Sequence, residues 1–248
     1  MKNKKRMASL LLAGCMAFSA VPVAFAADVE QATVASDEEQ KPTSGTCGEH
    51  VTWSLSEDGT LTISGTGEME NYDDSTSFPK WDRDLVQNIV IEPGVTSIGD
   101  NAFCGIDNLK SIDIPEGVTR IGEEAFWACD NLETVTFPDS LEEIGESAFF
   151  GCSMLQSIEI PQSVTQIGAE AFGHCGHLKR AILPEGITAI KEAMFSNCGC
   201  LEEVYIPKSV QTIEDYGFYG CVALTKFELP MGLKTIGKEA FASCGSIN

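Results

Sequence analysis

The hydrophobic positions of this chain follow one period from residue 103 to the C-terminus. Phenylalanine recurs every 23 residues, at Phe103, Phe126, Phe149, Phe172, Phe195, Phe218 and Phe241. Cysteine follows three positions later in every copy but the first, at Cys129, Cys152, Cys175, Cys198, Cys221 and Cys244. A fixed period in the twenties is typical of a solenoid of small stacked repeats. We therefore expect equivalent side chains to lie above one another, with the phenylalanines in one continuous inner column.

Each repeat contains three kinds of apolar segment. Leu132, Val135 and Phe137 precede a proline, and this spacing predicts a short strand with inward side chains that ends at the proline, which lacks a backbone donor. A second apolar pair, such as Val118 and Ile121, indicates another short extended segment. The following residues, EEAFWAC at 123–129, favour a helical turn with Ala, Phe and Cys facing inward.

Residues 46–88 do not follow the period and predict a separate N-terminal cap. Polar and apolar residues alternate over 50–55 and 60–64 with a turn at 56–59, which is the pattern of a β-hairpin. A short helix or turn is expected over 81–86. A solenoid needs such a terminal unit to cover the end of its core. The cap residues expected to be buried are Trp53, Leu55, Leu61, Ile63 and Trp81.

The first 45 residues carry export signals. A basic head (Lys2, Lys4, Lys5 and Arg6), an apolar run and small residues before Ala27 predict a secretory signal peptide over 1–26. As an alternative, the sequence LAGC at 12–15 resembles a lipoprotein box, in which Cys15 would carry the lipid anchor. Residues 27–45 are polar and acidic, and are expected to form a flexible leader.

The charge of the chain limits its partners. The net charge is −21. It becomes −25 without residues 1–26, because 12 basic residues then face 37 acidic ones. Such a field repels phosphate backbones and anionic lipid, so binding to nucleic acid and direct insertion of the mature chain into a membrane are not expected.

The repeat pattern resembles that of a known family. The pattern L-x-x-I-x-I-P-x-x-V-x-x-I-G-x-x-A-F-x-x-C resembles the BspA-like subfamily of leucine-rich repeats, and residues 47–53 and 65–67 are similar to the module that precedes such repeats. The resemblance covers residue 46 to the last residue. It implies a right-handed solenoid over 89–248, a secreted or cell-surface location, and adhesion to host proteins or other cells. It implies no catalytic residue. The departures are Ile106 in the first cysteine position, Lys191 and Glu214 in place of glycine, and Ala181 in a strand core position.

The cysteine pattern bears on the redox state. Ten cysteines in an exported chain suggest disulfides by count. Six of them share one inner position, however, which favours free buried thiols that act as small apolar plugs over a ladder of disulfides. Cys47 and Cys104 lie outside this set, and a disulfide between cap and first coil is the hypothesis for them.

Enzymatic and metal chemistry have weak support in the sequence. Neither a G-x-S-x-G nor an H-E-x-x-H motif is present, so we predict no enzyme and no cofactor. The weak metal candidate is His174, His177 and Cys200, since zinc accepts such ligands, although their spacing matches no zinc motif.

Two surfaces are candidates for ligand binding, and an extracellular protein or glycan is the expected partner. The first is the outward strand face, at Arg180, Ile182, Glu203, Tyr205, Lys226 and Glu228, because solenoids commonly present such a face to ligands. A plain solvated sheet is the open alternative. The second is an aromatic patch of Trp127, Phe150 and Tyr219, which would suit a carbohydrate or cell-wall ligand if exposed. Ile247 fills the leucine position of the last coil and the sequence ends at Asn248 without the strand that would follow, which suggests a fragment of a longer protein.

Overall fold

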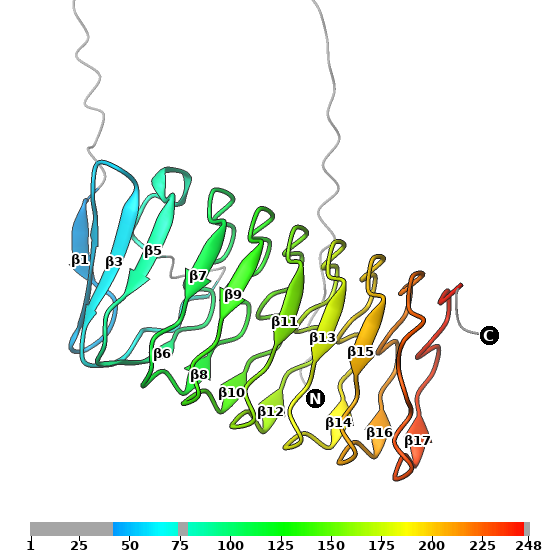
Figure 1. Ribbon diagram of the computed structural model, residues 1–248. Coiled ribbons are helices and arrows are strands. Elements are labelled where there is room, and N and C mark those ends of the chain that lie inside the picture. Colours follow the sequence, from blue (N-terminus) through cyan, green and yellow to red (C-terminus); the bar gives the residue numbers. More distant parts are fainter. Residues whose placement is uncertain (1–41, 74–78, 246–248) are drawn as a thin grey trace, which may run out of the picture. The chain divides into compact units, whose positions relative to one another are not determined.

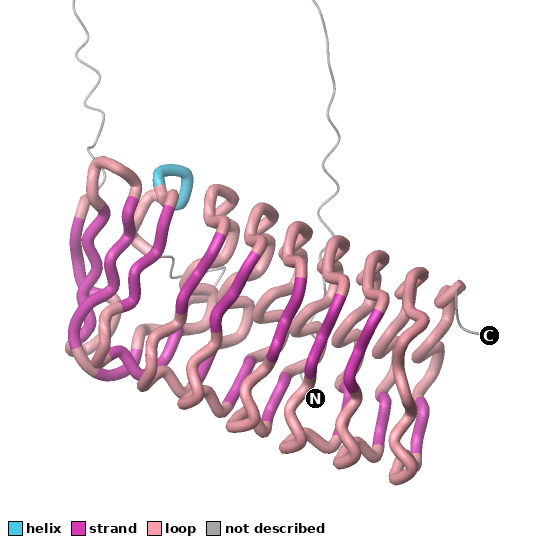
Figure 2. Tube along the Cα trace, in the orientation of Figure 1, coloured by secondary structure: helices cyan, strands magenta, loops and turns pink. Residues whose placement is uncertain are grey.

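The computed structural model describes residues 42–73 and 79–245. These residues form a row of stacked coils, and most coils contribute one short strand to each of two parallel ladders (Figures 1 and 2). The predicted signal peptide, Cys15 with its alternative lipid anchor, and most of the predicted leader lie outside the described residues. Ile247 also lies outside them.

The first ladder is built from the strands that precede the prolines. Its strands are β5 (Asn88–Ile91), β7 (Ser111–Asp113), β9 (Thr134–Thr136), β11 (Ser157–Glu159), β13 (Arg180–Ile182) and β15 (Glu203–Tyr205). The pairs β7–β9, β11–β13 and β13–β15 are parallel and join residues 23 apart. The predicted first strand is thus confirmed in the repeats that contain β7 to β15, whereas residues 224–229 of the last repeat form only an isolated bridge, between Lys226 and Glu203.

The second ladder comes from the apolar pair that follows each proline. It contains β4 (Gly67–Glu68), β6 (Val95–Ile98), β8 (Arg120–Ile121), β10 (Glu143–Ile144), β12 (Gln166–Ile167), β14 (Ala189–Ile190), β16 (Thr212–Ile213) and β17 (Thr235–Ile236). These strands fall into two parallel sheets, β4-β6-β8-β10-β12 and β14-β16-β17. Ile121 pairs with Ile144 and Ile144 with Ile167, so this ladder also keeps the 23-residue register.

The prediction of a helical turn after the second strand is wrong. Glu124 and Ala128 have φ values of 55° and 52°, which a right-handed helix does not contain. The amides of this segment donate to the next coil instead: Phe126 N–H bonds Ala148 O and Ala128 N–H bonds Phe150 O, both at 2.8 Å. Since a helix would satisfy these donors within one coil, the turns gain a third set of bonds between coils. The inward burial of Ala125, Phe126 and Cys129 is confirmed.

The phenylalanines form the inner column that the period predicts. Phe149 stacks on Phe126 with ring centroids 5.1 Å apart and on Phe172 at 5.5 Å, with interplanar angles of 5° and 2°. Ring contacts continue from Phe103 to Phe241. Each buried ring contributes about 1.5–3 kcal/mol of transfer free energy. Because neighbouring coils share this surface, the stability of the fold is collective.

The N-terminal cap is a small sheet that continues into the first ladder. The predicted hairpin is confirmed as β2 (Val51–Leu55) and β3 (Thr60–Gly65), and β3 pairs in parallel with β5. A further strand, β1 (Ser44–Thr46), pairs with β2, so Ser44 and Gly45 belong to this sheet and not to a leader. One 3₁₀ turn, η1 (Arg83–Leu85), lies in the expected helical segment. All five predicted cap residues are buried, and the Trp81 ring lies 5.7 Å from Trp53 and 5.9 Å from Phe103.

Candidate binding surfaces

The predicted strand face is assembled on β13 and β15. Arg180 is the register partner of Glu203, and Ile182 that of Tyr205. Arg180 Nε lies 3.5 Å from Glu203 Oε2. Tyr205 is 47% exposed, and its hydroxyl donates to Glu185 Oε1 at 2.7 Å. This hydrogen bond, together with the charge of Glu185, raises the pKa of the Tyr205 phenol. The face therefore combines an exposed ring with paired charges.

A groove of about 710 Å³ is lined by residues of β15 and by residues 225–232. Four of the six predicted residues line it: Glu203, Tyr205, Lys226 and Glu228. Arg180 and Ile182 lie on the neighbouring strand. At the groove the first ladder is reduced to a single bridge between Glu203 and Lys226. The apolar side chains of Leu229 and Met231 are exposed along it. We refer to this surface as the strand-face groove.

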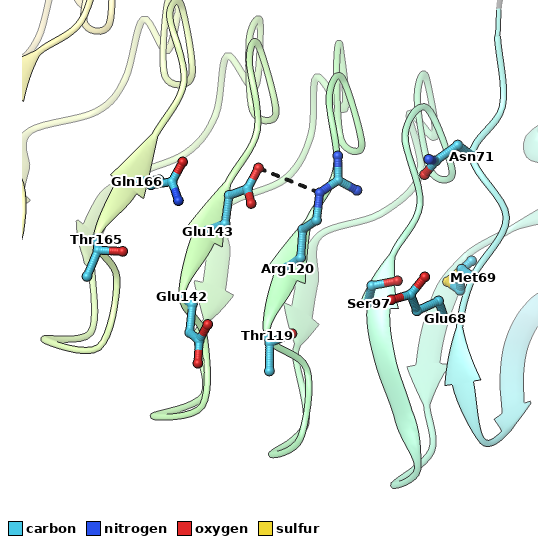
Figure 3. Close-up of a pocket in the computed structure, with 10 residues that line it drawn as sticks. All are labelled: Glu68, Met69, Asn71, Ser97, Thr119, Arg120, Glu142, Glu143, Thr165 and Gln166. Atoms are coloured by element: carbon cyan, nitrogen blue, oxygen red, sulfur yellow. Dashed lines mark ion pairs between the residues drawn. The ribbon is translucent and has the colours of Figure 1, made fainter.

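A second concave surface lies on the other ladder, and sequence reasoning missed it. Glu68, Ser97, Arg120, Glu143 and Gln166 are successive register partners across β4, β6, β8, β10 and β12. With Met69, Asn71, Thr119, Glu142 and Thr165 they line an open cavity of about 410 Å³ (Figure 3). We call this surface the polar groove. The signal was present in the sequence, because the charged residues Arg120 and Glu143 each stand directly before an inward isoleucine.

Arg120 is the single basic side chain among the residues that line the polar groove. Its Nη2 lies 2.7 Å from Asp100 Oδ1, and its Nε lies 3.6 Å from Glu143 Oε1. Burial lowers the pKa of Arg120, but the hydrogen bond to Asp100 and the charge of Glu143 outweigh burial and raise it. Asp100 N–H in turn donates to Asn71 Oδ1 at 2.9 Å. Arg120 thus lies between two carboxylates, those of Asp100 and Glu143. The cap loop is attached to the same place, because Asn71 bonds the backbone of Asp100.

The predicted aromatic patch is divided into two clusters. Trp127, which is 40% exposed, stacks on half-buried Phe150 at 6.5 Å, and Phe150 lies 4.7 Å from the His174 ring. A Cβ atom at Gly173 would come within 2.9 Å of the Phe150 ring, so glycine leaves room for this contact. Tyr219 instead packs edge-on against Tyr216 at 5.9 Å. Trp127 and Phe150 are therefore brought together, whereas the ring contact of Tyr219 belongs to another coil.

The weak zinc candidate is not assembled as a metal site. In residues 42–73 and 79–245, no group of three or more His, Cys, Asp or Glu side chains is placed to hold a metal ion. His177 Nδ1 lies 2.9 Å from Ser153 O, and His174 Nε2 lies 3.1 Å from Asn197 Nδ2. Cys200 is an exposed free thiol. The two imidazoles therefore interact with the loops of neighbouring coils.

The six periodic cysteines are free thiols with one shared partner type. Each Sγ donates to the carbonyl of the phenylalanine 26 residues earlier, on the preceding coil, as in Cys175 to Phe149 O at 3.3 Å. Burial raises the pKa of Cys129 and Cys198 to about 12. These thiols therefore remain protonated, and each forms a hydrogen bond from its own coil to the preceding one.

The hypothesis of a disulfide between Cys47 and Cys104 is not supported, because the two buried residues are not bonded to each other in this structure. They have different surroundings: Cys47 lies near Glu70 and Tyr72 in the cap, whereas Cys104 lies near Cys129 in the turn segment. Burial raises the pKa of Cys47 to about 12.

Comparison with known proteins agrees with this geometry. The family model of the BspA type leucine-rich repeat region matches residues 81–201 and 188–248, with six copies. A leucine-rich cell surface protein of Faecalibacterium prausnitzii has 32% identity and a TM-score of 0.61, and the match covers 85% of this chain and 54% of that one. The leucine-rich repeat protein of T. pallidum has 27% identity and a TM-score of 0.61, with 82% and 90% covered. A leucine-rich repeat protein of Bacteroides ovatus has 29% identity and a TM-score of 0.51, with 79% and 56% covered.

This chain therefore spans about half the length of the first of these relatives. A comparison with curated proteins found no match. Across the described part of the chain, no helix has the length and apolarity needed to cross a membrane. Two ladders in a 23-residue register, the stacked phenylalanine column and the match over 81–248 lead to one conclusion: the chain belongs to the BspA-type leucine-rich repeat family.

Proposed function

We propose that this protein is a cell-surface or secreted binding module, and that it recognises an extracellular protein through the strand-face groove. The observation that carries the proposal is the position of Tyr205, which is 47% exposed and lines a groove of about 710 Å³. Tyrosine is enriched among residues that dominate binding energy, because it combines a large apolar surface with a polar tip.

The chemistry around Tyr205 supports a protein ligand. Leu229 and Met231 supply exposed apolar area, and Lys208, Lys226 and Glu228 supply charges of both signs at the edge. An apolar centre with a polar rim is the usual anatomy of a protein interface. The relatives that carry the same repeats include a leucine-rich cell surface protein, which is consistent with an outer location for this chain. Adhesion to host proteins or other cells is the proposed biological outcome.

The test is a binding screen against a panel of extracellular matrix proteins, followed by surface plasmon resonance with variants. Tyr205→Ala is expected to weaken the interaction by about tenfold or more, since central aromatic anchors commonly contribute that much. Thr134→Ala is the matched control, because Thr134 is an exposed outward residue of the same ladder at a distance of three coils. Unchanged affinity in both Tyr205→Ala and Arg180→Ala would place the contact elsewhere.

Carbohydrate binding is the second candidate, and the exposure of Trp127 favours it. The indole is 40% exposed and stacks on Phe150, which forms an aromatic surface separate from the strand face. A glycan array with the intact chain and Trp127→Ala tests this function. Loss of a glycan signal in Trp127→Ala with retention in Tyr205→Ala would support it. A signal that survives Trp127→Ala would refute the aromatic surface as the site.

A further inference from the structure

The polar groove on the second ladder contains more hydrogen-bond acceptors than its own side chains use. Arg120 is already occupied on both sides by Asp100 and Glu143. Glu68 and Glu142 are exposed and form no ion pair within the described residues. Ionised carboxylates only accept hydrogen bonds. A ligand for these two side chains must therefore supply donors.

A serine side chain adds a second kind of polar group to the groove. Ser97 is 7% exposed, lines the groove and is the register partner of Glu68. Its hydroxyl has no hydrogen-bond partner among the described residues. Because the residue lines an open cavity, a ligand in the groove can form a hydrogen bond with this hydroxyl. In Figure 3 the Ser97 side chain is seen among the polar residues that line the cavity.

We propose that the polar groove binds an extended cationic peptide segment of a protein partner, whose lysine or arginine side chains contact Glu68 and Glu142. The charge of the lining residues fits this occupant, since Glu68, Glu142 and Glu143 face one guanidinium, which is itself neutralised. The net charge of −21 attracts such a partner over longer range. Because the groove lies on the other ladder, this inference is independent of the strand-face groove.

The spacing of the two free carboxylates sets the spacing of the cations. Glu68 is on β4 and Glu142 directly precedes β10, three steps away in the sheet order β4-β6-β8-β10. Three steps of about 4.8 Å between strands place them about 14 Å apart. An extended peptide rises about 3.4 Å per residue, so cations about four residues apart match the pair.

Two synthetic peptides of equal charge test the proposal by isothermal titration calorimetry with the intact chain. Acetyl-Lys-Ser-Ser-Ser-Lys-amide has the matching spacing, and acetyl-Lys-Lys-Ser-Ser-Ser-amide has adjacent cations. We expect the spaced peptide to bind at least about threefold more tightly, and Glu68→Gln or Glu142→Gln to weaken it about tenfold. Glu159→Gln, which makes the same charge change at an exposed position of β11, is expected to change affinity less than about twofold.

The opposing outcomes are distinct. Equal affinity for both peptides, or equal losses in Glu142→Gln and Glu159→Gln, would mean that the chain attracts cations only through its net charge, and would overturn the site. Binding of neutral chitotetraose in competition with the spaced peptide would assign the groove to a saccharide instead.

Ser97→Ala separates binding from folding: we expect weaker binding of the spaced peptide with an unchanged urea midpoint, because this hydroxyl has no partner in the free protein. Full affinity in Ser97→Ala would remove the hydroxyl from the proposed site.

Discussion

The contact between Phe137 and Phe149 offers a direct measure of how the first strands are tied to the inner column. The Phe149 ring stacks on Phe126 and Phe172, and Phe137 meets it edge-on at 5.8 Å with an interplanar angle of 87°. Edge-to-face pairs contribute about 0.5–1.5 kcal/mol beyond the area they bury. Leucine keeps much of the volume of phenylalanine but loses these ring contacts. We therefore expect Phe149→Leu to lower the free energy of unfolding by about 2–3 kcal/mol, and Phe137→Leu by about 1 kcal/mol.

A double-mutant cycle isolates the contact between these two rings. Urea unfolding, followed by circular dichroism and by tryptophan fluorescence, gives the free energies of the parent, both single variants and the double variant. The coupling energy should be about 0.5–1.5 kcal/mol. Phe195→Leu with Phe137→Leu is the control cycle, because the Phe195 ring contacts are with Phe172 and Phe218. A coupling below about 0.3 kcal/mol in the Phe137–Phe149 cycle would refute the reasoning, since distant sites are additive to that level.

Two further predictions concern the thiols. In the native chain, iodoacetamide should modify exposed Cys200 rapidly and the buried Cys129, Cys152, Cys175, Cys198 and Cys221 only after denaturant is added, as read by mass spectrometry; rapid native labelling of Cys175 would contradict the buried column. The second is a loss of stability at alkaline pH. Buried thiols such as Cys129 and Cys198 keep their protons up to about pH 12, whereas thiols of the unfolded chain release theirs above about pH 8.5. Each thiol should therefore lower the free energy of unfolding by up to about 1.4 kcal/mol per pH unit above pH 8.5, with no contribution below it. Urea unfolding of Cys198→Ala should show a shallower decline than the parent, and an identical slope would count against the linkage.

The 23-residue period predicted most of the fold, because each repeat must bury the same apolar side chains. Every inward phenylalanine and leucine must find a neighbour, and residues 23 apart supply it, so both ladders and the inner column followed from spacing. The helical turn failed for a physical reason. The residues of 123–129 have good local helix propensity, but Glu124 and Ala128 take positive φ so that their segment bonds the adjacent coil. Hydrogen bonding between coils overrides local propensity there.

The candidate surfaces were less predictable, because they depend on contacts outside the repeat. The strand-face groove follows in part from outward alternation, which placed Glu203, Tyr205, Lys226 and Glu228 correctly on one face. The polar groove needs the cap residues Met69 and Asn71, whose placement no period specifies. The departures from glycine were visible in the sequence, but their complementarity was not: Lys191 Nζ lies 3.0 Å from Glu214 Oε1, so the two substitutions form an ion pair across neighbouring coils.

The constant register of the coils determines which changes in length the protein can tolerate. Each coil offers the next the same strand edges, the same carbonyl for a thiol and the same ring face, 23 residues later in each case. Deletion or duplication of one whole 23-residue coil would therefore join equivalent surfaces and keep all of these contacts. A single residue inserted within a strand would displace the strand pairing, the thiol hydrogen bonds and the phenylalanine stacking together. Expansion and contraction by whole units is thus the variation that this architecture tolerates.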